Sequence, residues 1–238
     1  MYQMEARVRY SEIDENNRIK LVSILDYFQD CCTFQSEDIG VGTEYLKELQ
    51  SAWLLASWQI VIEKYPRLGE KMIVGTMPYD FKGLYGCRNM LLQDEEGTVM
   101  AYANSNWIFV DIETGKPKRI PLEVMKMYEL EEPYPMECAP RKIKMPKRPV
   151  EKQEILIHRF CIDSNHHVNN GKYVLIAEEF LPSDFRVREL RVEYKKAAVL
   201  SDTLYPLVEE SSEKVTVVLA DRDKSPYAIV EFFGGKND

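Results

Sequence analysis

One polar stretch of the chain places an acid, an amide and an imidazole at alternate positions: Asp163, Asn165 and His167. In an extended segment, the side chains of residues i, i+2 and i+4 point to the same side. We therefore expect these three groups to converge on one small volume, with Ser164 and His166 on the opposite side. The spacing predicts a catalytic loop.

This combination of groups suits the hydrolysis of an activated acyl group. Water needs a base to remove its proton, and a tetrahedral oxyanion needs hydrogen-bond donors. Imidazole titrates at about pH 6.5, near the working range, whereas a carboxylate needs burial to raise its pKa to match. Asn169 or Asn170 is expected to support the site by capping a following helix, whose free amides favour developing negative charge.

Two other interpretations of the stretch stay open. Asp163 and Asn165 could serve only to hold a loop through Asx turns. The histidines could instead bind a metal ion together with Asp163, since imidazole is the commonest metal ligand. A strand followed by a loop would point them in different directions, so no metal is expected. These histidines are His158, His166 and His167.

The cysteines favour a reducing, cytosol-like compartment. They are odd in number and lack CxxC spacing, a poor basis for a disulfide framework. Cys161 could be a nucleophile beside the histidines, but a cysteine directly after a strand is more typical of a small buried hydrophobic residue. The five are Cys31, Cys32, Cys87, Cys138 and Cys161.

The composition limits the class of protein. A hydrophobic content of 45% and a charged content of 29% are ordinary for a globular protein. The net charge of −8 argues against nucleic-acid binding. The N-terminus shows no secretory signal pattern, and no apolar run approaches the roughly 18 residues that span a bilayer. We expect a cytoplasmic protein without a membrane span.

Hydrophobic periodicity gives two halves with the same order of elements: strand, loop, helix, then antiparallel strands. In the first half we expect a strand over 2–10, helices over 21–39 and 45–55, and strands over 58–62, 71–79, 84–92 and 99–109. In the second half we expect a strand over 155–160, a helix over 173–180, and strands over 187–194, 203–208, 215–220 and 227–233.

A proline-rich segment separates the halves. Five prolines fall in the 17 residues from Pro133 to Pro149, and proline suits neither a helix interior nor a central strand. The predicted organisation is an N-terminal unit over 1–132, an extended basic linker over 133–149 and a C-terminal unit over 150–238.

The halves also match as an internal repeat. Residues 13–19 lie over 162–168 at an offset of 149, and residues 60–70 lie over 192–202 at an offset of 132. Arg18 then stands where His167 stands. Because arginine stays protonated at any working pH, it cannot be a general base. If the loop performs acid–base chemistry, only the second copy can do so.

The stretch from Asp163 to Tyr173, with the pattern D-x-N-x-H-V-N-N-x-K-Y, resembles the signature of the acyl-acyl-carrier-protein (acyl-ACP) thioesterases of plant plastids and bacteria. The segment 193–196 is similar to a second block of that family. The resemblance implies an α+β double hotdog fold, in which each half wraps an antiparallel sheet around a long helix. It also implies hydrolysis of fatty acyl-ACP to free fatty acid without a cofactor, catalysis by Asp163, Asn165 and His167, and acyl-chain binding in the N-terminal half.

The chain departs from the plant pattern at one place. Where plant members have a glutamate and then a cysteine after the second block, this chain has Ala197 and Ala198. A Cys–His–Asn mechanism is therefore excluded at that site. We expect Asp163 or His167 to be the base and Asn165 to orient the water or the thioester carbonyl.

Acyl carrier protein is acidic, so docking it on an acidic chain requires a local basic patch. An alternative is that the basic residues named next belong to a solvent-exposed linker and bind no partner. The docking candidates are Arg141, Lys142, Lys144, Lys147, Arg148, Lys195 and Lys196.

Other functions stay open at this level. The chain could hydrolyse acyl-CoA, act as a dehydratase or hydratase of the same fold, or bind acyl chains without hydrolysis, as Ala197 and Ala198 suggest. The duplicated unit is compatible with a monomer or a homodimer.

Overall fold

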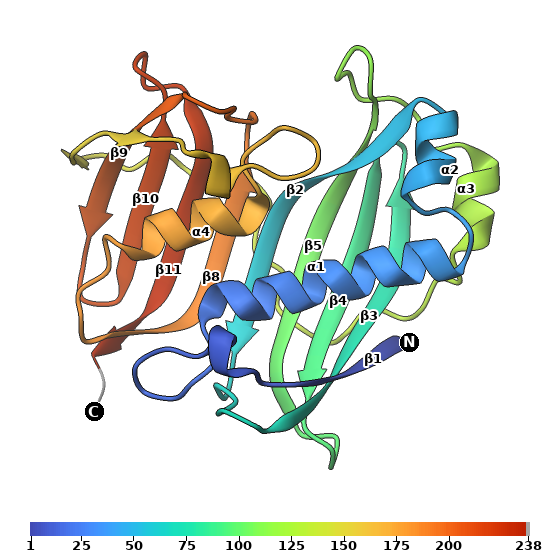
Figure 1. Ribbon diagram of the computed structural model, residues 1–238, viewed down its shortest axis with the longest axis horizontal. Coiled ribbons are helices and arrows are strands. Elements are labelled where there is room, and N and C mark those ends of the chain that lie inside the picture. Colours follow the sequence, from blue (N-terminus) through green and yellow to red (C-terminus); the bar gives the residue numbers. More distant parts are fainter. Residues whose placement is uncertain (237–238) are drawn as a thin grey trace. The chain divides into compact units, whose positions relative to one another are not determined.

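The computed structural model describes residues 1–236, which form two compact units (Figure 1). The first comprises Met1–Ala56 and Ile60–Cys138, and the second comprises Ser57–Gln59 and Ala139–Asp238. Among the described residues, no helix is long and apolar enough to cross a membrane. The predicted boundaries at residues 132 and 150 stay a prediction.

The first unit packs one long helix against a sheet with strand order β1-β3-β4-β5-β2 (Figure 1). Helix α1 forms because Ile24, Leu25, Phe28 and Cys31 recur at three- and four-residue spacing, and all four are fully buried. The elements are β1 (Tyr2–Arg7), α1 (Leu21–Asp38), α2 (Thr43–Glu48), β2 (Ser51–Ile62), β3 (Lys71–Lys82), β4 (Tyr85–Gln93), β5 (Val99–Asp111) and α3 (Leu122–Met127).

The second unit repeats this arrangement with strand order β8-β11-β10-β9-β6, and β7 pairs with β9. Its helix is short and lies against β10 and β11 (Figure 1). Tyr173, Val174 and Ala177 form its buried face. The elements are β6 (Val150–Glu151), β7 (Ile155–Leu156), α4 (Asn170–Glu178), β8 (Phe185–Tyr194), β9 (Thr203–Glu210), β10 (Lys214–Ala220) and β11 (Pro226–Lys236).

Residues 139–149 of the proline-rich segment contain no helix or strand and lie on the second unit's sheet. The Ile143 amide donates to the buried Glu193 carboxylate at 2.8 Å, and the Arg148 amide donates to Glu209 at 2.7 Å. Buried carboxylates that accept backbone amides satisfy both groups at once. The segment is therefore fastened to this sheet. Ile143 shares a buried cluster with Leu207, Val218, Ala220 and Ile229.

Several predicted elements were wrong at their ends. The strand over 2–10 ends at Arg7, and the strand over 58–62 already begins at Ser51. The helix over 45–55 stops at Glu48, because Gln50 adopts a positive φ of 48°, and Ser51 begins β2. The strand over 155–160 ends at Leu156 and is followed by a 3-10 turn at Arg159–Cys161. The helix over 173–180 begins earlier, at Asn170, and ends at Glu178, so at nine residues it is shorter than the long helix that the resemblance implied.

The internal repeat is confirmed in the backbone at both predicted offsets. The Val8 amide donates to the Glu70 carbonyl at 3.0 Å, and its counterpart Ile157 donates to Asp202 at 2.8 Å. A second pair of bonds, Ile19 to Pro66 at 2.8 Å and Val168 to Ala198 at 2.9 Å, matches in the same way. The positive φ angles also match: Asn17 with His166, and Gly69 with Ser201.

Replacing Glu178 at the end of α4 should change how stability depends on pH. Burial, with a smaller contribution from Glu179, raises the pKa of Glu178 from 4.5 to about 7. The folded protein then holds this proton more tightly than the unfolded chain, so stability is full below pH 4.5 and falls as the pH rises to about 7. We expect Glu178→Gln to be more stable by on the order of 2 kcal/mol at pH 8 and equal to wild type near pH 4.5.

Urea unfolding of the two proteins across this pH range measures the difference. The exposed Glu154→Gln serves as the matched control and should track the wild type throughout. A constant offset between Glu178→Gln and wild type at all pH values would contradict the assignment.

Candidate active site

The polar stretch forms a tight loop instead of the extended segment expected from its alternation. Ile162 and Val168 face each other in an antiparallel bridge that closes the loop, and the Asp163 amide donates to the His167 carbonyl at 2.8 Å. His166 turns the chain with a positive φ of 62°. The expectation that alternation alone aligns the three side chains was therefore wrong.

The Asp163 carboxylate organises this loop. Its Oδ1 accepts the amide of Asn165 at 2.8 Å and the amide of His167 at 3.3 Å. The side chains of Asn165 and His167 are exposed and make no hydrogen bond within residues 1–236. The Asx-turn interpretation thus describes Asp163 correctly. The structure joins the three residues through the backbone and does not link their side chains to one another.

The first copy builds the same loop with different side chains. Asp14 Oδ1 accepts the amides of Asn16 at 2.8 Å and Arg18 at 2.9 Å, and the Asp14 amide donates to the Arg18 carbonyl at 2.7 Å. The loop shape is therefore independent of the histidine. What distinguishes the second copy is an imidazole at position 167, where the first copy has a permanent cation.

Helix α4 begins directly after the loop, and its predicted cap is confirmed. The Asn169 side chain accepts the Gly171 amide at 2.9 Å, and Asn170 is the first helical residue. The Asn170 carbonyl accepts the Tyr194 hydroxyl at 3.0 Å, which ties the helix start to β8. The positive end of the helix dipole lies beside the loop and favours negative charge there.

Ala198 borders the loop through its backbone. Its carbonyl accepts the Val168 amide at 2.9 Å, and its amide donates to the Tyr173 hydroxyl oxygen at 2.8 Å. Burial raises the pKa of Tyr173 to about 12, so this phenol stays neutral. Ala198, one of the two alanines at which the chain departs from the pattern of the family that it resembles, is thus adjacent to the Asp163 loop. Sequence reasoning missed the contact, although Tyr173 stands within the motif.

The remaining groups near the loop have structural roles. Cys161 is buried and free, which confirms that it is a small core residue. The His158 ring stacks on Phe160 with a centroid distance of 5.9 Å. Within residues 1–236 there is no group of three or more His, Cys, Asp or Glu residues that could hold a metal ion.

The candidate docking residues differ in their ion pairs and in their exposure. Lys195 pairs with the buried Glu193 at 3.0 Å, and Lys196 pairs with Asp221. Arg141 is half-buried, whereas Lys142, Lys144, Lys147 and Arg148 are exposed.

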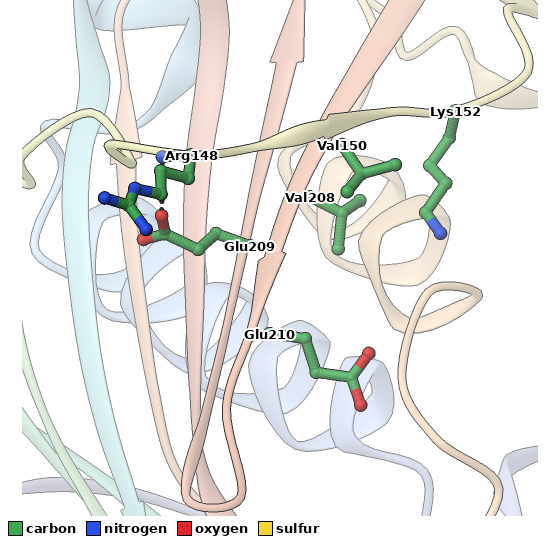
Figure 2. Close-up of a pocket in the computed structure, with 6 residues that line it drawn as sticks. All are labelled: Arg148, Val150, Lys152, Val208, Glu209 and Glu210. Atoms are coloured by element: carbon green, nitrogen blue, oxygen red, sulfur yellow. Dashed lines mark hydrogen bonds between the residues drawn. The ribbon is translucent and has the colours of Figure 1, made fainter.

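Arg148 borders a shallow hollow at the edge of the second unit's sheet (Figure 2). The hollow has a volume of about 460 Å³, and Lys152 and the Glu209 and Glu210 carboxylates also line it. Figure 2 shows that the Arg148 and Glu209 side chains lie near each other, so part of the positive charge in this hollow is offset.

Comparison with known proteins decides the family. Residues 1–128 match the acyl-ACP thioesterase N-terminal domain, and residues 145–226 match the C-terminal domain. The chain belongs to the acyl-ACP thioesterase family. It is 23% identical over 233 residues to oleoyl-acyl carrier protein thioesterase 1 of Arabidopsis thaliana, with 89% of this chain and 64% of that protein covered.

A second relative is an acyl-[acyl-carrier-protein] hydrolase of Cuphea viscosissima. It is 24% identical over 219 residues, with 82% of this chain and 52% of that protein covered. Both relatives are chloroplastic. The chain therefore spans about half to two thirds of the length of these curated relatives.

Solved structures confirm the double hotdog fold. An acyl-ACP thioesterase from Bacteroides thetaiotaomicron superposes with a TM-score of 0.89 at 24% identity, over 98% of this chain and 96% of that one. The 12:0-ACP thioesterase from Umbellularia californica superposes with a TM-score of 0.85 at 16% identity, over 99% and 97% of the two chains.

Removing the carboxylate of either loop should destabilise its unit by a similar amount. Asp14 and Asp163 each accept two backbone amides through Oδ1. We expect Asp14→Ala and Asp163→Ala each to lower the free energy of unfolding by about 1–2 kcal/mol, measured in urea. Asp14→Asn and Asp163→Asn retain an acceptor oxygen and should lose less than half as much. Equal losses for Asn and Ala would show that the amide contacts are not the cause.

Proposed function

We propose that this chain hydrolyses the thioester of a fatty acyl-ACP and releases the free fatty acid. The supporting observation is that both domains of the acyl-ACP thioesterase family match. Both copies form the same loop, but only the second copy carries a histidine in it. The relatives named above act on acyl carrier protein thioesters according to their names.

Within the loop we assign different roles to the three residues. The Asp163 carboxylate already accepts two backbone amides, so we propose that its role is to hold the shape of the loop. We propose that His167, which is exposed on the same loop, is the base. Asn165 orients the water or the thioester carbonyl. The dipole of α4, capped by Asn169, stabilises the oxyanion.

The proposed reaction runs through a tetrahedral intermediate. The water oxygen bonds to the carbonyl carbon while the imidazole of His167 takes a water proton. When the carbonyl re-forms, the C–S bond breaks, and the imidazolium returns the proton to the departing thiolate. The products are a fatty acid and the free thiol of the carrier, and the reaction consumes only water and the thioester, without a cofactor.

Alanine substitution in the two copies tests these roles. We expect His167→Ala to lower kcat/KM on acyl-ACP by at least a hundredfold, the scale of a lost general base, and Asn165→Ala by at least tenfold. Asp163→Ala should lower it as well by disordering the loop. The counterparts Asn16→Ala and Arg18→Ala should change it by less than twofold. Wild-type kcat/KM in Asp163→Ala, Asn165→Ala and His167→Ala would refute the site.

Ala197 and Ala198 favour a second candidate function, acyl binding without hydrolysis, because the plant glutamate and cysteine are missing. Release of free thiol from acyl-ACP by the wild-type protein decides between the two. Comparison of kcat/KM on acyl-ACP and acyl-CoA with the same chain then identifies the carrier.

We further propose that exposed basic residues of the proline-rich segment attract the acidic carrier. Reversing Lys142, Lys144 and Lys147 to glutamate together should raise KM for acyl-ACP about tenfold at low salt, and the difference should shrink at high salt. Lys116→Glu, an exposed charge reversal in the first unit, is the matched control. An unchanged KM in the triple variant would refute the docking role and show that these residues are part of a solvent-exposed linker.

A reducing, cytoplasm-like location is also proposed, supported by five cysteines that are all free. Fractionation of cells that express the chain checks the location, and light scattering distinguishes a monomer from a homodimer.

A further inference from the structure

Four exposed apolar residues lie on two neighbouring backbone segments beside the Asp163 loop. The exposed fractions are 50% for Leu156, 72% for Phe160, 42% for Val199 and 45% for Leu200. Leu156 lies on β7, which pairs with the start of β9, and the turn at 199–202 connects back to Ile157 through the Ser201 amide at 3.1 Å. We call these four residues the apolar patch.

The patch borders the loop on both sides. Phe160 lies in the 3-10 turn that leads into Ile162, where the loop closes, and Val199 follows Ala198, whose carbonyl accepts the Val168 amide at 2.9 Å. A partner seated on the patch would therefore lie next to Asp163 and His167. The His158 ring stacks on the Phe160 ring.

The internal repeat shows whether the fold itself requires apolar residues at these exposed positions. At the matching offsets the first copy has Arg7, Ser11, Arg67 and Leu68, all exposed. An exposed aromatic ring, Tyr10, occurs there one position before Ser11. Two arginines thus occupy the places of Leu156 and Val199 while the backbone bonds stay the same. The fold therefore does not require apolar residues at the positions of Leu156, Phe160 and Val199, and of the two copies only the one that carries the histidine motif has them there. The fourth position is leucine in both copies, Leu68 and Leu200.

Exposed apolar clusters without a folding role mark interaction sites. We propose that the apolar patch is the docking surface for the acyl carrier protein, an inference that rests on the proposed function. The thioester is attached to the carrier protein, so it reaches the loop only if the carrier protein docks beside the loop. The exposed Arg159, which precedes Phe160 in the 3-10 turn, matches an acidic carrier. Apolar anchors supply the affinity, while distant basic residues steer the approach.

Substituting the patch should separate carrier recognition from chemistry. Phe160→Ser introduces the residue that the first copy has at this position, and Phe160→Ser with Leu200→Ser removes the two anchors together. We expect the double variant to lower kcat/KM on acyl-ACP about tenfold through KM, at low and high salt alike. Turnover of the same acyl group on pantetheine and the melting temperature should stay unchanged. Leu122→Ser, which alters a side chain that is 57% exposed in the first unit, should change none of these quantities.

Three outcomes would overturn the inference. An equal loss on acyl-ACP and acyl-pantetheine would place the patch in the catalytic site, and no loss would leave it without a docking role. A wild-type dimer that dissociates in the variant would make the patch a contact between copies. If the wild type hydrolyses neither thioester, the proposed function fails separately. The Kd for acyl-ACP, measured by fluorescence anisotropy, then still tests docking, and an unchanged Kd in the double variant refutes it.

Discussion

The acceptance of two backbone amides by one carboxylate is the interaction on which the site depends. Asp163 Oδ1 fixes the amides of Asn165 and His167, and this fixes the direction in which the loop returns to Val168. The next residue, Asn169, caps α4, so one carboxylate determines where the helix begins relative to the histidine. A bond from an amide to a charged acceptor is worth more than a neutral one. This explains how a short exposed loop keeps one shape.

Duplication separates what this loop needs to fold from what it needs for chemistry. Both copies keep the aspartate, the positive φ at the fourth loop position and the closing bridge. They differ at the position of Arg18 and His167 and at the positions of Leu156, Phe160 and Val199. The shared features provide hydrogen-bond partners for backbone amides and carbonyls, which both copies need in order to fold. In the second copy the residues that differ are exposed, and function is expected to reside in such positions.

The sequence was sufficient to predict most of the elements and the repeat because both rest on local periodicity and on spacing, but the short helix α3 was not predicted. The buried face of α1 and the paired strands follow directly from such patterns. The alternation argument failed at Asp163, because it assumed extended backbone in a segment where an Asx turn competes for the amides. Partners distant in sequence were also unpredictable: neither the Tyr173–Ala198 bond nor the Glu193–Ile143 bond has a local signal.

The bonds between Ala198 and its neighbours in the loop and in α4 do not depend on the alanine side chain. Both contacts of Ala198, to Val168 and to Tyr173, use its backbone and are independent of its side chain. A change of side chain at this position therefore leaves the support of the loop intact. Ala198 is itself fully buried, so a methyl group there exposes no polar atom that would need a partner. The chemistry that remains available beside α4 is that of the exposed imidazole at position 167 and its amide neighbour, on a loop whose shape is set elsewhere.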